Sequence, residues 1–167
     1  MSNFVALARN AYAIFVSIVS RLQNPLLLAI RLYWGLQFMQ DGWGKLTHLD
    51  KVTDFFTSLS LPAPHATALL VALVEFCGGF LFTVGIASRL VSLVLFVNMT
   101  MAYLSVPDDR TNFSHIFSKP EDFYGASPYT YWFAALLILI LGPGRFAVDT
   151  LLRRVFNAEG ERAHTSV

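Results

Sequence analysis

The chain has 167 residues, of which 55% are hydrophobic and 14% are charged, and its formal net charge is +1. Soluble domains carry about 25% charged residues, so this composition excludes a soluble globular domain and favours one integral membrane domain. The chain also lacks a basic cluster with interleaved aromatic residues, and we therefore expect no nucleic-acid partner.

Residues 1–23 are predicted to form an amphipathic helix that lies in the membrane interface. The apolar residues that recur there at helical spacing are Phe4, Leu7, Ala11, Ile14, Phe15 and Ile18. No small-x-small cleavage site follows them, which disfavours a secretory signal peptide. Pro25 suits the first turn of a helix, so a new helix is expected to begin there.

Four later segments are apolar enough to be predicted as membrane spans. They are residues 25–46, 66–87, 90–106 and 129–147. Ser88 and Arg89 form a tight turn between the second and third spans, which makes these two helices antiparallel neighbours. The Gly142-Pro143-Gly144 sequence is expected to kink or end the fourth span.

The segments between the spans are expected to pack on the bundle. Residues 47–65 contain a short interfacial helix, which ends at the Pro62-Ala63-Pro64 stretch, and residues 107–128 form a polar and aromatic cap. The apolar face of the short helix consists of Leu49, Val52, Phe55, Phe56 and Leu59. The predicted fold class is therefore all-α, an integral membrane four-helix bundle with an N-terminal amphipathic helix and a tail over residues 149–167.

The charged residues predict the orientation of this bundle. With four spans, both termini lie on one side, and the arginines on that side are Arg9, Arg21, Arg89, Arg145, Arg153, Arg154 and Arg162. The opposite side has fewer cations and most of the acidic residues. Because cytoplasmic loops carry an excess of Lys and Arg, both termini and the tail are predicted to be cytoplasmic.

Three of the spans combine a polar residue with small residues on one helical stripe. The stripes are Arg31, Gly35, Phe38 and Gly42 in the first span, Ala68, Ala72, Glu75 and Gly79 in the second, and Val94, Asn98, Ala102 and Ser105 in the third. Small residues let transmembrane helices approach closely, and polar residues face the interior of a bundle. We expect the three stripes to converge on a common interior.

The charges of Arg31 and Glu75 are costly in a bilayer, and their role is open. They can form a buried ion pair that fixes the register of the helices. Alternatively, they can line a polar pocket for a lipid-soluble molecule such as a quinone. In that pocket Glu75 would handle the proton, as the catalytic residue, while Arg31 and Asn98 orient the head group. Transport and direct partner contacts are further alternatives.

The depths of these two charges in the membrane do not match well. Arg31 lies ~10 Å from one boundary and Glu75 ~14 Å from the other, across a core of ~30 Å. Unless long side chains bridge the difference, Arg31 is expected to pair with Asn98, which leaves Glu75 nearer Gln37. The histidines have no His-x-x-x-His spacing, so no metal is expected. The candidate ligand-binding residues are Arg31, Gln37, Asn98, Asp41 and Lys45.

Several short motifs in this order resemble the DoxX family. They are Arg31 in the first span, Gly42-Trp43-Gly44-Lys45-Leu46 at its end, Glu75-Phe76-Cys77-Gly78-Gly79 in the second span, and Val84-Gly85-Ile86-Ala87-Ser88-Arg89 after it. The resemblance covers roughly residues 24–148 and defines the predicted four-span domain. The family pattern His-Gly-x-x-Lys has Asp41 in place of its histidine here.

The resemblance implies a protein of the bacterial inner (plasma) membrane, similar in part to the small subunit of thiosulfate:quinone oxidoreductases. It implies a membrane oxidoreductase component, with a quinone as the expected cofactor. Its partners would be the lipid bilayer, the quinone, a redox partner protein and further copies of the chain. The alternatives are a non-enzymatic membrane scaffold or assembly partner and a small-molecule or lipid carrier.

Overall fold

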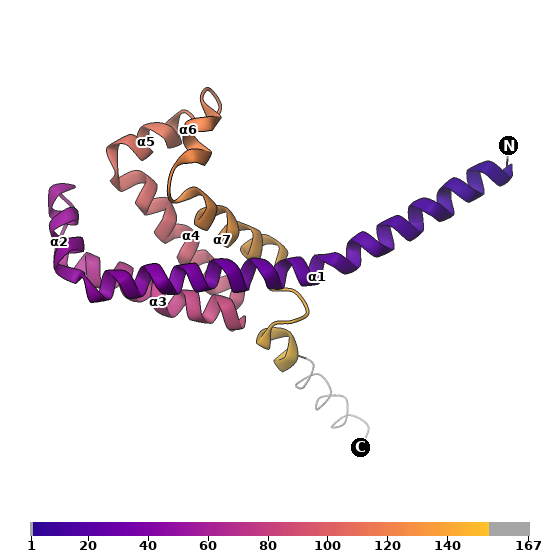
Figure 1. Ribbon diagram of the computed structural model, residues 1–167, viewed down its shortest axis with the longest axis horizontal. Helices are drawn as coiled ribbons and strands as arrows, with labels where there is room; N and C mark the ends of the chain where they lie inside the picture. Colours follow the sequence, from indigo (N-terminus) through magenta and orange to yellow (C-terminus); the bar gives the residue numbers. More distant parts are fainter. Residues whose placement is uncertain (1, 154–167) are drawn as a thin grey trace, which may run out of the picture.

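The computed structural model describes residues 2–153, and every regular element in that range is a helix (Figure 1). In chain order these are α1 (Ser2–Thr47), α2 (Leu49–Ser58), α3 (Pro64–Val84), α4 (Ser88–Ser105), α5 (Pro107–Ser114), α6 (Pro120–Gly125) and α7 (Tyr129–Leu141). A further helical turn covers residues 148–153. The predicted all-α class is confirmed, whereas residues 154–167 of the predicted tail, with Arg154 and Arg162, lie outside the described residues.

Three helices are long and apolar enough to cross a membrane, namely α1 from Arg9 onward, α3 and α4. The chain is therefore a multi-pass membrane protein. The helix α7 is also apolar, but it has only 13 residues, which is about 20 Å at 1.5 Å per residue. It ends at Leu141 because Gly142 adopts a φ of 83° and Pro143 follows. The fourth span therefore stays a prediction.

The long helix α1 continues through Pro25, where the sequence analysis expected a new helix to begin. Pro25 has no N–H, so the carbonyl of Arg21 lacks its usual helical partner at this point. The N-terminal half of α1 extends away from the other helices (Figure 1), and its large side chains, such as Tyr12 and Phe15, are exposed. The side chain of Phe4 lies outside the described residues. Residues 2–23 are helical as part of α1, and their place in the membrane interface stays a prediction.

The buried core is formed where α1, α3, α4 and α7 meet. Its members are Leu27 and Phe38 of α1, Phe82 of α3, Val91, Leu95 and Met99 of α4, and Ala135 and Ile138 of α7. All residues of the predicted stripes in the first two spans are buried, so these stripes are correct. The predicted third stripe is wrong, because Val94 is exposed and Asn98 is half-buried, while α4 turns a different face to the core.

Two glycines allow the backbones of α1 and α3 to approach closely. Gly79 of α3 lies so close to α1 that a Cβ there would be 2.8 Å from the carbonyl oxygen of Gly35 and 2.8 Å from the amide nitrogen of Met39. A Cβ on Gly42 would likewise meet the backbone of α3, at 2.8 Å from the carbonyl oxygen of Ala72. Because these contacts involve backbone atoms, a side chain cannot be accommodated by a rotamer change.

We expect Gly79→Ala to destabilise the protein by about 1–3 kcal/mol, since overpacking forces backbone shifts. Gly44→Ala is the matched control, because a Cβ at Gly44 has no neighbour within 4 Å. Alanine also has the higher helix propensity, so this control should be neutral or slightly stabilising. Unfolding in mixed detergent micelles measures both variants, and equal effects of the two substitutions would contradict the close approach.

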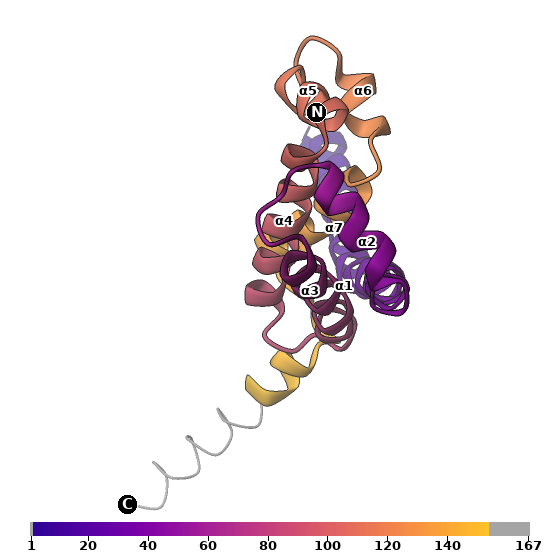
Figure 2. The same ribbon diagram turned by 90° about the vertical axis from the view of Figure 1, so that its left-hand side faces the viewer.

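The helices α5 and α6 cover the ends of α4 and α7 (Figures 1 and 2). Tyr103 of α4 is fully buried, and its hydroxyl donates to the carbonyl of Phe123 at 2.9 Å. The two rings stack with centroids 5.2 Å apart, and Phe113 packs against both of them. The predicted cap over residues 107–128 is therefore confirmed as a packed part of the molecule.

Candidate functional site

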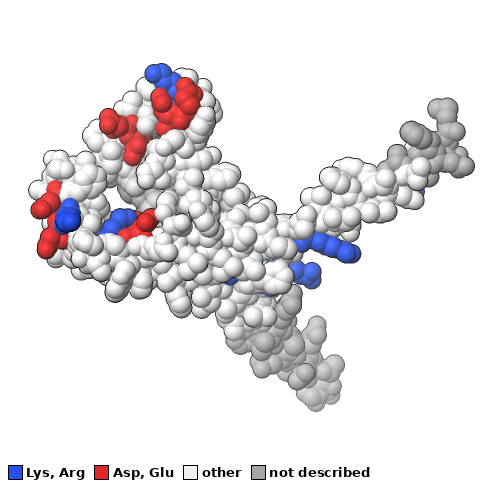
Figure 3. Space-filling view, in the orientation of Figure 1, with Lys and Arg blue, Asp and Glu red and all other residues white. Residues whose placement is uncertain are grey.

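A cleft of about 490 Å³ lies between α2, α3 and α4 and is closed on one side by Ser127 and Pro128. Figure 3 shows this hollow beside α2, with basic and acidic atoms next to each other inside it. Its walls are largely apolar, and the side chains that form them include Phe55, Phe56, Leu59, Leu61, Val71 and Met101. Phe55, Phe56 and Leu59 of the apolar face predicted for the short helix thus line a cleft on the bundle, whereas Leu49 and Val52 do not.

Three polar residues meet in this cleft, one from each of three helices. Lys45 of α1 forms a short ion pair with Oε2 of Glu75, and the amide Nδ2 of Asn98 donates to Oε1 of the same carboxylate at 3.2 Å. The side chain of Glu75 is 2% exposed and that of Lys45 is 32% exposed. Both oxygens of the buried carboxylate therefore have a donor, as buried charge requires.

The packing of α1 on α3 places this cluster. Gly42 contacts the backbone of Ala72 and Phe76, and Lys45 follows Gly42 by three residues on the same face of α1. Glu75 lies on the facing stripe of α3. Lys45 therefore extends the stripe that begins at Arg31, because it follows Gly42 by three residues. This helical spacing could have been recognised from the sequence.

A second, smaller cavity of about 130 Å³ borders the same ion pair. Lys45 and Glu75 line both cavities, while Asp41 and Tyr131 line only the smaller one. Because Asp41 is exposed, the smaller cavity brings an ionisable group at the surface close to the buried carboxylate. Four of the candidate site residues, Asp41, Lys45, Glu75 and Asn98, are therefore gathered in one place.

Asp109 of α5 also lines the larger cleft. Partial burial, and then the neighbouring charge of Asp108, raise the pKa of Asp109 above its usual range. The sequence analysis expected residues 107–128 to pack on the bundle, but it did not select Asp109, because nothing in the sequence showed which residue of this cap would line a cleft.

Arg31 lies at the C-terminal end of α3, whereas Glu75 lies near the middle of this helix, and Arg31 pairs with neither Glu75 nor Asn98. Its guanidinium donates to the carbonyls of Phe82 at 3.1 Å, Thr83 at 2.8 Å and Pro143 at 2.8 Å. Phe82 follows Glu75 by seven residues, which is about 10 Å along a helix. The predicted pairings of Arg31 are therefore wrong. The arginine instead satisfies carbonyls at the end of α3, which have no partner within the helix.

Gln37, the remaining candidate, is half-buried on α1 and lines neither of the two cavities beside Glu75. It makes no side-chain hydrogen bond within residues 2–153, so its expected place next to Glu75 is not seen. Among the same residues, no group of three His, Cys, Asp or Glu side chains is arranged to hold a metal ion.

The turn between α3 and α4 is fastened by Asp149, which the sequence analysis assigned only to the tail. The carboxylate of Asp149 accepts hydrogen bonds from the amides of Ala87 and Ser88 and from the Ser88 hydroxyl, each at 2.8 Å. Its own amide donates to the carbonyl of Gly85 at 3.0 Å. The side chain of Ala87 cannot cap α4, so the carboxylate of Asp149, which is distant in sequence, caps the helix instead. No local sequence signal identifies which acidic residue takes this role.

The comparisons with known proteins agree with the helical membrane architecture. The family model described as DoxX matches residues 26–108, which include the part of α1 after Pro25, all of α2, α3 and α4, and the cluster around Glu75. Comparison with curated proteins and with solved structures yields no match.

Proposed function

Residues 26–108 place this chain in the DoxX family, and from that membership we propose that it is a membrane oxidoreductase component whose cleft binds a quinone or a similar lipid-soluble molecule. One observation carries the proposal, namely the Lys45–Glu75–Asn98 cluster inside an otherwise apolar cleft. Apolar walls with a few convergent polar groups are typical of small-molecule sites.

The cleft fits the size and chemistry of a quinone head group. Its volume of about 490 Å³ lies within the range of roughly 300–1,000 Å³ that is common for ligand pockets. An ammonium group has three N–H donors and a side-chain amide has two, so Lys45 and Asn98 each keep a donor after bonding to Glu75. These remaining donors would bind a carbonyl oxygen of the head group.

Glu75 would hold or release a proton beside that carbonyl. The exposed Asp41, which shares the smaller cavity with Glu75, would connect this proton to the aqueous phase. A bound quinone would supply the redox chemistry, and a redox partner protein would supply the electrons. Arg31 has no part in this site, because its guanidinium is engaged by carbonyls at the C-terminal end of α3.

The proposed orientation places the cleft on the outer side of a bacterial inner membrane. Five exposed arginines lie in the parts of the chain away from the cleft, namely Arg9, Arg21, Arg89, Arg145 and Arg153, whereas Arg110 lies on α5. The acidic residues gather on α2, α5 and α6, at the ends where the cleft lies (Figure 3). The excess of arginine would be cytoplasmic. The bundle would then have four spans, with α7 as the shortest.

Quinone binding to the purified full-length protein tests the proposal. We expect a short-chain quinone analogue to quench tryptophan fluorescence, and Glu75→Gln to weaken this binding by about tenfold, the equivalent of one hydrogen bond at ~1.4 kcal/mol. The matched control is Glu121→Gln, because Glu121 is exposed on α6 and lines no part of the cleft.

The other outcomes distinguish the alternative functions. If wild type binds no quinone analogue and Glu75→Gln only lowers thermal stability, the polar cluster is structural and a scaffold is the better description. If liposomes with the protein take up a solute, and no quinone analogue competes, the cleft belongs to a carrier.

A further inference from the structure

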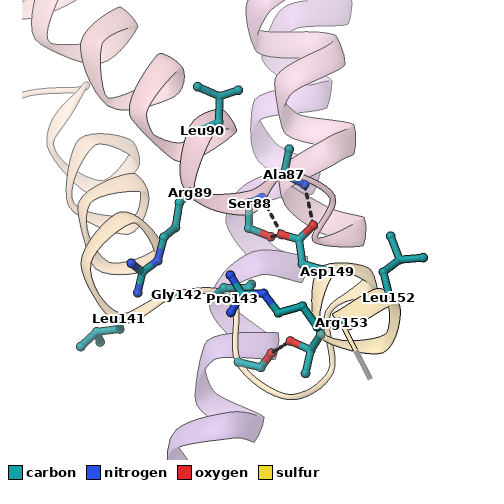
Figure 4. Close-up of a pocket in the computed structure, with 12 residues that line it drawn as sticks. Ala87, Ser88, Arg89, Leu90, Leu141, Gly142, Pro143, Asp149, Leu152 and Arg153 are labelled. Carbon is teal, nitrogen blue, oxygen red and sulfur yellow. Dashed lines mark hydrogen bonds between the residues drawn. The ribbon is translucent and has the colours of Figure 1, made fainter. Parts of the chain in front are cut away.

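We infer that a separate hollow, at the opposite end of the molecule from both of the cavities beside Glu75, binds the phosphodiester head group of an anionic phospholipid. This hollow has a volume of about 710 Å³ and lies between the turn that joins α3 to α4 and the segment that follows α7 (Figure 4). Nothing in the proposed quinone site involves it, since this hollow and the cleft that holds the Lys45–Glu75 pair share no lining residue.

Two arginines make the lining of this hollow basic. Arg89 and Arg153 approach from opposite sides, and Figure 4 shows both guanidinium groups turned toward the Gly142–Pro143 segment. Arg89 has one long hydrogen bond, of 3.4 Å, to the carbonyl of Ile140. Arg153 makes no hydrogen bond or ion pair within residues 2–153. Their donors therefore remain available for an anion.

The acid in the hollow does not neutralise these arginines fully. Asp149 accepts three hydrogen bonds from Ala87 and Ser88 at the N-terminus of α4, as Figure 4 shows. Burial alone would raise the pKa of Asp149, yet the hydrogen bonds from Ser88 and Ala87 and the charge of Arg153 hold it below its usual range. The carboxylate is thus directed at the helix end, and the hollow keeps an excess of positive charge.

The position of the hollow identifies the source of the anion as a lipid. The apolar helix α4 begins at Ser88 and the apolar helix α7 ends at Leu141, so the hollow lies where the apolar surface stops and head groups begin. Next to the arginines, the side chains of Leu90, Ile140 and Leu141 are 64%, 63% and 50% exposed. These would contact the acyl chains.

The chemistry of the two arginines favours an anionic over a zwitterionic lipid. A guanidinium binds phosphate through a planar pair of N–H donors. The ammonium group of a zwitterionic head group would bring a positive charge next to Arg89 and Arg153. Phosphatidylglycerol brings no such charge, and anionic lipids attract basic residues near the membrane surface.

The test measures lipid retention by the full-length protein in nanodiscs and by native mass spectrometry. We expect phosphatidylglycerol to be retained about tenfold more than phosphatidylcholine, and the double variant Arg89→Gln with Arg153→Gln to lose this preference. Arg110→Gln is the control, because Arg110 is exposed on α5 at the far end of the molecule. The double variant with lysine at both positions should retain part of the preference, since it keeps the charge without the planar donor pair.

Three results would overturn the inference. The first is equal retention of the two lipids by wild type. The second is an undiminished preference in the glutamine double variant. The third is displacement of phosphatidylglycerol by millimolar inorganic phosphate, which would identify a site for a free anion. Circular dichroism of each variant confirms that it is folded.

Discussion

Replacing Arg31 with alanine is expected to lower the free energy of unfolding by about 3–5 kcal/mol. The guanidinium is 1% exposed and donates to three carbonyls, two at the end of α3 and one in the segment after α7. The substitution leaves these acceptors without donors and opens a cavity beside Gly85, where a Cβ would lie 2.6 Å from a guanidinium nitrogen of Arg31. Unfolding in mixed detergent micelles measures the loss.

Two further variants separate the geometry of Arg31 from its charge. Arg31→Lys keeps one positive charge but cannot reach three carbonyls in the same plane, so its stability should fall between wild type and Arg31→Ala. Arg21→Ala removes an exposed arginine from the same helix and should change stability by less than about 0.5 kcal/mol. An Arg31→Ala variant as stable as Arg21→Ala would contradict this role.

The second large effect is expected for Lys45→Met, which leaves the buried carboxylate of Glu75 without its cation. Breaking a buried ion pair by removing one partner costs about 3–5 kcal/mol, and the partial exposure of Lys45 places the expected loss near 3 kcal/mol. Asn98 still donates to one carboxylate oxygen, which limits the loss.

The double variant Lys45→Met with Glu75→Leu provides the control for this prediction. It removes both charges and replaces them with apolar side chains of similar size, so most of the lost stability should return. The coupling energy from the complete double-mutant cycle should exceed about 1 kcal/mol. Additive effects of the two substitutions would show that the pair does not interact.

The sequence predicted the burial of Glu75 correctly but not its partner. Helical spacing identified the buried stripes on α1 and α3, because polar and small residues recurred there at intervals of three and four. Spacing within one helix cannot determine how far that helix is displaced along its neighbour. That displacement depends on where Gly42 and Gly79 let the backbones touch, and it brings Lys45 rather than Arg31 to Glu75.

The error on α4 has a different physical cause. The predicted stripe was counted from Asn98, on the assumption that a polar residue in a span faces a closed interior. Asn98 faces the cleft instead and is only half-buried, whereas the closed core takes Leu95 and Met99. The cleft depends on α2 and on residues 127–128, which are distant in sequence, so no pattern within α4 could reveal it.

The length of α1 restricts how the protein can lie in a membrane. Its 46 residues would measure about 69 Å when straight, more than twice the thickness of a hydrocarbon core of ~30 Å. Pro25 divides the helix near its middle and leaves the carbonyl of Arg21 without a helical partner, so α1 bends more easily there than elsewhere. Residues 2–24 can then change their angle to the membrane while the packed half of α1 holds Arg31 and Lys45 in place. The distance to which the N-terminal helix extends along the membrane surface is therefore independent of the geometry of the cleft.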